Sequence, residues 1–107
     1  MTQGAVVLVT CPNRTVARRL GKALVQRRLA ACVNLLPAVE SVFWWRGRVD
    51  TSREVLLLIK TTRRLLPRLA RAVVELHPYD LPEVLALPVA AGHPPYLRWV
   101  ASSVLAR

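Results

Sequence analysis

Residues 55–59, with the sequence Val-Leu-Leu-Leu-Ile, are apolar at every position and give the strongest indication of the fold. A strand without a polar position is buried on both faces, so it belongs in the middle of a sheet. We expect this strand to run from Val49 to Thr61. The run Ala-Val-Val-Leu-Val-Thr at residues 5–10 has the same character and predicts a second central strand.

A segment before this strand has the features of an edge strand. Residues 30–36 and residues 39–45 are both strand-like, and Pro37 interrupts them. Because proline cannot donate to a strand ladder, it favours an edge strand or a bulge at this place. Residues 46–48 then predict a turn into the central strand, with Gly47 free to take a positive φ.

Three other segments carry apolar residues at helical spacing. The first runs from about Arg14 to Leu29, with Asn13 or Thr15 as its N-cap. The second covers residues 62–76, and a short C-terminal helix covers residues 96–106.

The predicted order of elements is strand, helix, strand, strand, helix and strand, followed by the C-terminal helix. The last strand is expected over residues 83–89. Two right-handed strand–helix–strand crossovers give a split βαβ sheet of the α+β class, with both helices on one face. The two fully apolar strands then fall in the middle of the sheet, so pattern and topology agree. We expect residues 1–107 to form one domain with its own core.

This arrangement leaves the other face of the sheet uncovered. Phe43, Trp44 and Trp45 add three adjacent aromatic side chains that one small subunit can hardly bury. Because a large exposed apolar patch usually marks a protein interface, we expect a homo-oligomer.

Residues 77–83, with the sequence His-Pro-Tyr-Asp-Leu-Pro-Glu, are a candidate functional loop. Pro78 ends the preceding helix and Pro82 stiffens the loop again, so the imidazole, phenol and carboxylate between them are held on a rigid segment. A plain connector between helix and strand is the alternative. His77 would then lie at a helix C-terminus, where a positive charge is favoured.

The net charge is +10, from 16 basic and 6 acidic residues. Such an excess has two interpretations. It indicates an anionic partner, such as nucleic acid, or it is a solvated charged face in an arginine-rich chain. RNA-recognition domains of this topology stack bases on aromatic residues of the two central strands. Residues 5–10 and 55–59 contain no aromatic residue. This argues against a nucleic-acid partner of that kind and leaves non-specific electrostatic binding open.

The sequence also predicts a compartment. No apolar run is long enough to cross a bilayer, so we expect no membrane partner. Residues 1–4 lead directly into a strand, so we expect no signal peptide and a cytoplasmic location. Cys11 and Cys32 fit that compartment as free thiols.

Candidate metal ligands are scattered along the chain, without a CxxC or HxxxH motif. They are Cys11, Cys32, His77, Asp80, Glu83 and His93. Thiolate and imidazole groups suit copper or zinc. Cys11, at a strand end, is a better candidate ligand than Cys32, which the pattern places within a strand as a small buried hydrophobe. Because no activated nucleophile or phosphate-binding loop is recognisable, we expect no enzyme.

Several motifs together resemble the CutA family of divalent-cation tolerance proteins. They are residues 9–13, 29–34, 58–61 and 77–83, Trp45 with Gly47, and Gly92 followed by Tyr96, Leu97 and Trp99. The resemblance spans nearly the whole chain. It implies a ferredoxin-like domain that assembles as a homotrimer, no established enzyme activity, and an association with copper and other divalent cations.

The resemblance also implies roles for particular residues. His77 matches a histidine proposed as a copper ligand in the family, and Cys11 lies close to a cysteine proposed for the same role. A trimeric protein of metal tolerance, with weak copper binding through these two residues, is therefore our first hypothesis. The expected trimer interface contains the aromatic residues Phe43, Trp44, Trp45, Tyr79 and Trp99.

A second hypothesis follows from the similarity of this architecture to the PII signalling proteins, which bind small ligands between subunits. A PII-like regulator would hold a small anionic ligand or a partner protein in the clefts of the trimer. Arg46, Arg48 and Lys60 are the expected anion contacts.

Overall fold

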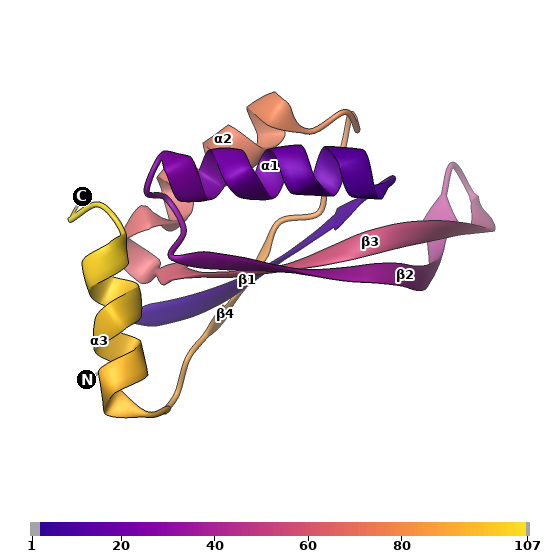
Figure 1. The fold of residues 1–107 in the computed structure, drawn as a ribbon. Coiled ribbons are helices and arrows are strands. Elements are labelled where there is room, and N and C mark those ends of the chain that lie inside the picture. Colours follow the sequence, from indigo (N-terminus) through magenta and orange to yellow (C-terminus); the bar gives the residue numbers. More distant parts are fainter. Residues whose placement is uncertain (1–2, 107) are drawn as a thin grey trace.

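The computed structural model describes residues 3–106, and four strands among them form one antiparallel sheet in the order β2-β3-β1-β4. Three helices and one short 3-10 turn make up the rest of the secondary structure in this part of the chain (Figure 1). The elements are β1 (Gly4–Cys11), α1 (Arg14–Gln26), β2 (Cys32–Trp45), β3 (Arg48–Thr62), η1 (Arg63–Leu65), α2 (Leu66–Leu76), β4 (Leu85–Pro88) and α3 (Pro94–Ser103).

The two apolar strands are central, as their sequences predict. β1 pairs along its whole length with the second half of β3, from Gly4 opposite Thr62 to Cys11 opposite Val55. Their burial alternates, however, because only one face of the sheet is fully packed within the chain. Burial on both faces, which the sequence predicted, therefore does not occur inside one chain.

Both long helices lie on the same face of the sheet, as the crossovers predict (Figure 1). Leu20 and Leu24 of α1 and Leu69 and Val73 of α2 are buried in one core with the inward side chains of β1 and β3. The side chain of Asn13 caps α1 by accepting the Val16 N–H at 2.9 Å. No helix within residues 3–106 is long and apolar enough to cross a membrane.

Several helix boundaries differ from the prediction. α1 ends at Gln26 rather than Leu29, because Arg28 takes a left-handed conformation with φ 58° and turns the chain toward β2. The second helix begins with η1, and the C-terminal helix covers Pro94–Ser103 rather than residues 96–106. β4 is shorter than predicted, so residues 83 and 84 stay in the loop.

β2 and β3 form a long hairpin that extends beyond the helices (Figure 1). β2 lies at the edge of the sheet, and its register shifts between Leu36 and Val39, where Ala38 has φ 63°. The predicted edge strand and bulge are thus confirmed. Trp45 and Arg48 pair across a two-residue turn in which both central residues have positive φ, including Gly47 at 79°.

The face of the sheet opposite α1 and α2 is apolar. Leu8 pairs with Leu58 on one side and with Leu85 on the other, so these three leucines share that face. At one end of this face α3 packs against β1 and β3, and Val100 is buried there. We call this surface the open face, and its apolar residues are Val6, Leu8, Leu36, Leu56, Leu58, Leu85 and Leu87.

Candidate functional site

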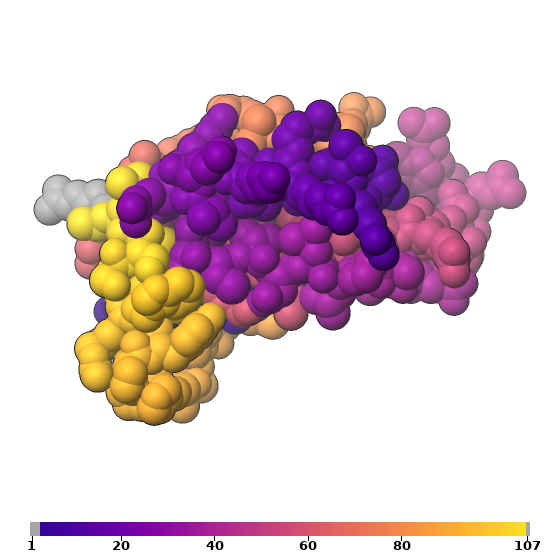
Figure 2. All heavy atoms as spheres, in the orientation of Figure 1, coloured from indigo at the N-terminus to yellow at the C-terminus, as the bar shows by residue number. Residues whose placement is uncertain are grey.

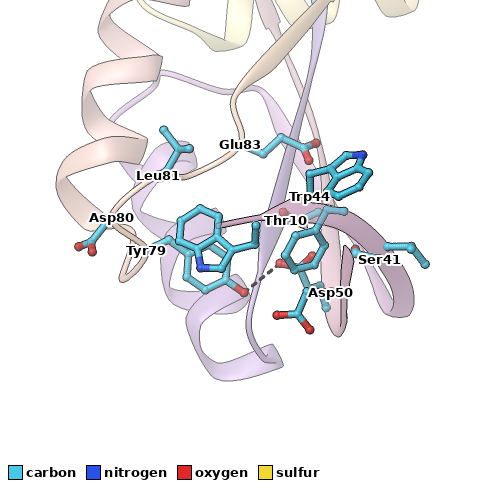
Figure 3. Close-up of a pocket in the computed structure, with 12 residues that line it drawn as sticks. Thr10, Ser41, Trp44, Asp50, Tyr79, Asp80, Leu81 and Glu83 are labelled. Carbon is cyan, nitrogen blue, oxygen red and sulfur yellow. Dashed lines mark hydrogen bonds between the residues drawn. The ribbon is translucent and has the colours of Figure 1, made fainter. Parts of the chain in front are cut away.

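The loop after α2 and the β2–β3 hairpin enclose a hollow of about 670 Å³ (Figure 3). The loop contributes one wall and the hairpin the other, with the end of β1 between them. We call this hollow the acidic pocket, and its lining residues are Thr10, Ser41, Val42, Phe43, Trp44, Trp45, Asp50, Glu54, Tyr79, Asp80, Leu81 and Glu83.

His77 fixes the loop to the end of β1. Its backbone N–H still bonds to Val73 at the end of α2, and its side chain is only 7% exposed. Nδ1 accepts the Tyr79 N–H at 3.1 Å, so the proton of the neutral ring is on Nε2. Nε2 lies 2.7 Å from the Thr10 carbonyl oxygen and donates to it. Both ring nitrogens therefore have partners in the fold.

Tyr79 links the same loop to β3 through a hydrogen bond. Its hydroxyl donates to Glu54 Oε2 at 2.9 Å, a contact drawn as a dashed line in Figure 3. Glu54 is only 8% exposed, so its carboxylate depends on this partner. Burial, followed by the hydrogen bond and the charge of Glu54, raises the pKa of Tyr79 to about 12. The phenol therefore stays a hydrogen-bond donor throughout the neutral range.

The pocket concentrates negative charge. Four of the six acidic residues of the chain line it, namely Asp50, Glu54, Asp80 and Glu83, although the Asp80 carboxylate turns away in Figure 3. Burial, with a smaller effect of the nearby Glu54 charge, raises the pKa of Glu83. Among residues 3–106, no Lys, Arg or His lines this pocket. An acidic cavity thus lies within a chain of net charge +10.

Comparison with known proteins identifies a family for this chain. Residues 5–103 match the family model described as CutA1 divalent ion tolerance protein. The chain belongs to that family. It is 50% identical over 95 residues to the divalent-cation tolerance protein CutA of Thermus thermophilus, covering 89% of this chain and 92% of that protein.

Other CutA1-family proteins are longer. Mouse protein CutA is 49% identical over 96 residues, which cover 90% of this chain but 54% of the mouse protein. The chain therefore spans about half the length of that curated relative and of the human one.

Solved structures share the fold. The T. thermophilus structure superposes with a TM-score of 0.93 at 48% identity, covering 94% of this chain and 98% of that one. CutA1 from rice superposes with a TM-score of 0.94 at 45% identity, covering 97% of this chain and 95% of the rice chain. The expected ferredoxin-like α+β fold is thereby confirmed.

The two metal ligands that the CutA resemblance implied occupy different surroundings. His77 faces the loop and Thr10, whereas Cys11 lies fully buried in the core beneath α1 and α2. Burial, with the charge of Glu54 second, raises the pKa of the Cys11 thiol to about 11, so it is protonated at neutral pH. Within residues 3–106, no three His, Cys, Asp or Glu side chains converge closely enough to hold a metal ion.

The other candidate ligands are dispersed. Cys32 lies on the open face, where Lys60 Nζ is 3.8 Å from its sulfur. His93 precedes α3, beyond the far end of β4. Asp80 and Glu83 alone fall in the acidic pocket.

The aromatic residues expected at a trimer interface form two groups. Phe43, Trp44 and Trp45 lie together at the pocket with Tyr79, and Trp44 is 75% exposed. Trp99 lies on α3, where its ring packs against Tyr96. One chain therefore does not bring all five together.

The anion contacts of the PII-like hypothesis are also apart. Arg48 begins β3 and Lys60 lies near its end. At roughly 3.3 Å per residue, these positions are about 40 Å apart along the strand. Arg46, in the hairpin turn, stacks over the Trp45 ring at 5.5 Å. These three residues form no anion site within one chain.

Sequence reasoning missed Glu54 and Asp50 as pocket residues. For Glu54 the sequence does give a usable signal, because this residue immediately precedes the fully apolar stretch of β3. A carboxylate beside a buried strand needs a specific partner. That partner, Tyr79, is 25 residues away in the sequence, and only the folded chain brings the two together.

Proposed function

We propose that this CutA1-family chain is a homotrimer that binds a divalent cation weakly in the acidic pocket and thereby contributes to metal tolerance. The observation that carries the proposal is the charge of that pocket, which holds four of six acidic residues and no basic lining residue among residues 3–106. Copper is the first ion to test, with zinc beside it. The proposal includes no enzymatic reaction.

The pocket offers oxygen ligands to a cation. Glu54 and Glu83 are close enough for the charge of one to raise the pKa of the other, and the Thr10 and Ser41 hydroxyl-bearing residues lie in the same lining. A divalent cation between the two carboxylates would relieve their repulsion. Because fewer than three ligands of one protomer converge, we expect weak binding that a neighbouring protomer can strengthen.

The imidazole of His77, with Cys11, remains the alternative ligand set for copper. In the folded chain a copper ion at His77 has to displace the bond to Thr10 or the bond from Tyr79. A cation at Cys11 has to displace the proton of a buried thiol. Both displacements cost free energy, which is why we favour the carboxylates.

Calorimetric titration of the tag-free protein with copper(II) and zinc(II) tests the proposal. We expect Glu54→Gln and Glu83→Gln to weaken binding about tenfold or more, since each loses a charge-assisted ligand. Glu75→Gln is the matched control, because Glu75 is an exposed acid on α2. His77→Gln keeps a donor for Thr10 while removing the imidazole.

The outcomes separate the hypotheses. Loss of copper binding in His77→Gln or Cys11→Ala alone would move the site to the alternative ligand set. Absence of saturable binding by the unmodified protein would reject cation handling. The PII-like regulator would then lead, and a thermal-shift screen of small anions would be the next measurement.

The open face supports the homotrimer. Leu85 and Leu87 are more than half exposed there, and the aromatic hairpin extends beyond the body of one chain. Burying these surfaces against other copies would remove a large apolar area from water. Because both cysteines are free thiols, we also propose a cytoplasmic location.

Light scattering tests the assembly. We expect a mass three times that of the 12.0 kDa chain. Leu87→Lys, on the open face, should give a folded monomer, whereas Val74→Lys, equally exposed on α2, should leave the mass unchanged. A monomeric unmodified protein at micromolar concentration would contradict the proposal.

A further inference from the structure

The outer surface of α1 and α2 carries most of the positive charge of the chain. Ten of its sixteen basic residues lie on these helices and their ends, and all ten are exposed. The same segments contain a single acid, Glu75. We call this surface the basic layer, and its residues are Arg14, Arg18, Arg19, Lys22, Arg27, Arg28, Arg63, Arg64, Arg68 and Arg71.

The charges of the basic layer come together where the two helices meet. A hollow of about 450 Å³ between the end of α1 and α2 is lined by three arginines, Arg27, Arg68 and Arg71, and by one acid, Glu75. Two further arginines are held by backbone oxygens rather than by carboxylates. Arg28 donates to the Ser103 carbonyl at 3.2 Å, and Arg64 to that of Ala106 at 2.6 Å. Such contacts orient a guanidinium without neutralising it.

We propose that the basic layer binds the phosphate backbone of duplex nucleic acid without sequence preference. Arginine matches a phosphate with two parallel hydrogen bonds, and a cluster of arginines releases many counterions from a duplex. The basic layer lies on the side of the sheet away from the open face, so it stays accessible when copies pack through that face (Figure 1). Figure 2 shows α1 spread across the upper surface.

Two features favour a duplex over other anionic partners. Neither helix contains an aromatic residue on which a single-stranded base could stack. A helix that binds a membrane inserts its apolar face, but Leu20 and Leu24 of α1 and Leu69 and Val73 of α2 are buried against the sheet. The basic layer therefore presents mainly positive charge. Such a surface suits contacts to the phosphate backbone of a duplex, which carry no sequence information.

Fluorescence anisotropy with a labelled duplex of about 20 base pairs tests the proposal, at salt concentrations from about 50 to 200 mM. The test variant is Arg19→Gln/Lys22→Gln/Arg71→Gln, all in the basic layer. The matched control is Arg46→Gln/Arg48→Gln/Arg53→Gln, all in the hairpin. Each lowers the net charge from +10 to +7, since three charges are removed. Light scattering and circular dichroism check that both keep the assembly and fold of the unmodified protein.

We expect the layer variant to bind the duplex about tenfold more weakly or worse, and the control to stay within about twofold. The plot of log affinity against log salt should flatten by about 0.9 for each lost phosphate contact. Equal weakening by both variants would overturn the proposal in favour of net charge alone. The proposal would also be overturned if the protein bound no duplex at the lowest salt concentration, or if it bound phosphatidylserine vesicles instead of the duplex. Cation titration of the layer variant should be unchanged, which separates this inference from the pocket.

Discussion

The Tyr79 hydroxyl donates to Glu54 Oε2 at 2.9 Å, and this bond joins the loop after α2 to the central strand β3. It gives a buried carboxylate its hydrogen-bond partner and sets one wall of the acidic pocket. His77 holds the same loop from the other side through Thr10. The loop is therefore fixed at two points, and the pocket exists before any ligand arrives.

Tyr79→Phe should destabilise the protein by about 1–3 kcal/mol, because Glu54 loses its donor while remaining buried. Glu54→Gln should cost less, since an amide oxygen still accepts from Tyr79. Urea unfolding of the two variants beside the unmodified protein measures the difference. Equal stability of Tyr79→Phe and the unmodified protein would show that the bond is not formed in solution.

His77→Ala should cost about 2–4 kcal/mol, because it leaves both the Thr10 carbonyl and the Tyr79 N–H without a partner. His77→Gln can still donate to Thr10, and His77→Asn can still accept from Tyr79, so each should cost less. Nitrogen NMR of the neutral ring should show the proton on Nε2. A proton on Nδ1 would contradict the hydrogen-bond pattern.

Stability should fall as pH rises from about 9 to 11. The Cys11 thiol ionises near its ordinary pKa of 9.0 in the unfolded chain, whereas burial raises the pKa to about 11 in the folded one. The folded state thus keeps a proton that the unfolded state loses. The free energy of unfolding therefore decreases as pH rises across this window. Urea unfolding at several pH values measures the slope.

Cys11→Ala is the control for this slope. It should lower stability at every pH, because a buried side chain is shortened, but the fall between pH 9 and 11 should become shallower. Tyr79, whose pKa is raised to about 12, continues the decline at higher pH in both proteins. An unchanged slope in the variant would assign the decline to other groups.

Gly47→Ala should cost about 1 kcal/mol, because φ is 79° there and an added Cβ disfavours that conformation. The open space around this position excludes a clash as the cause, since nothing lies within 4 Å of the added atom. Arg46→Asn should instead stabilise by about 0.5 kcal/mol, as asparagine tolerates its φ of 51° better. Thermal melting checks both, and destabilisation by Arg46→Asn would argue that the Trp45 stacking outweighs the turn.

The central strands, the Asn13 cap, the bulge near Pro37 and the turn at Gly47 could be predicted because each depends on neighbouring residues. Hydrophobic periodicity, a capping side chain and a missing N–H are local causes. Helix ends were predicted less well. α1 stops at Gln26, because Arg28 takes a positive φ that its own side chain does not signal.

The acidic pocket could be predicted only in part. The loop at residues 77–83 is distinctive enough to mark as a candidate, but its partners come from the hairpin and β1. Glu54 and Glu83 carry no sign in the sequence that they will be neighbours. The role of His77 as a two-sided anchor also depends on Thr10, which lies 67 residues away.

The layers, the central strands, the family and the excess of positive charge could all be inferred from the sequence, because these follow from composition and from patterns within one element. The distribution of the charge is visible only in the folded chain. Carboxylates gather in a pocket between the loop and the hairpin, and arginines lie over the helices on the far side of the sheet. Hydrophobic periodicity predicts only which face of a strand or helix a side chain occupies. Which distant residue it meets there is set by strand register and by the helices that pack over the sheet.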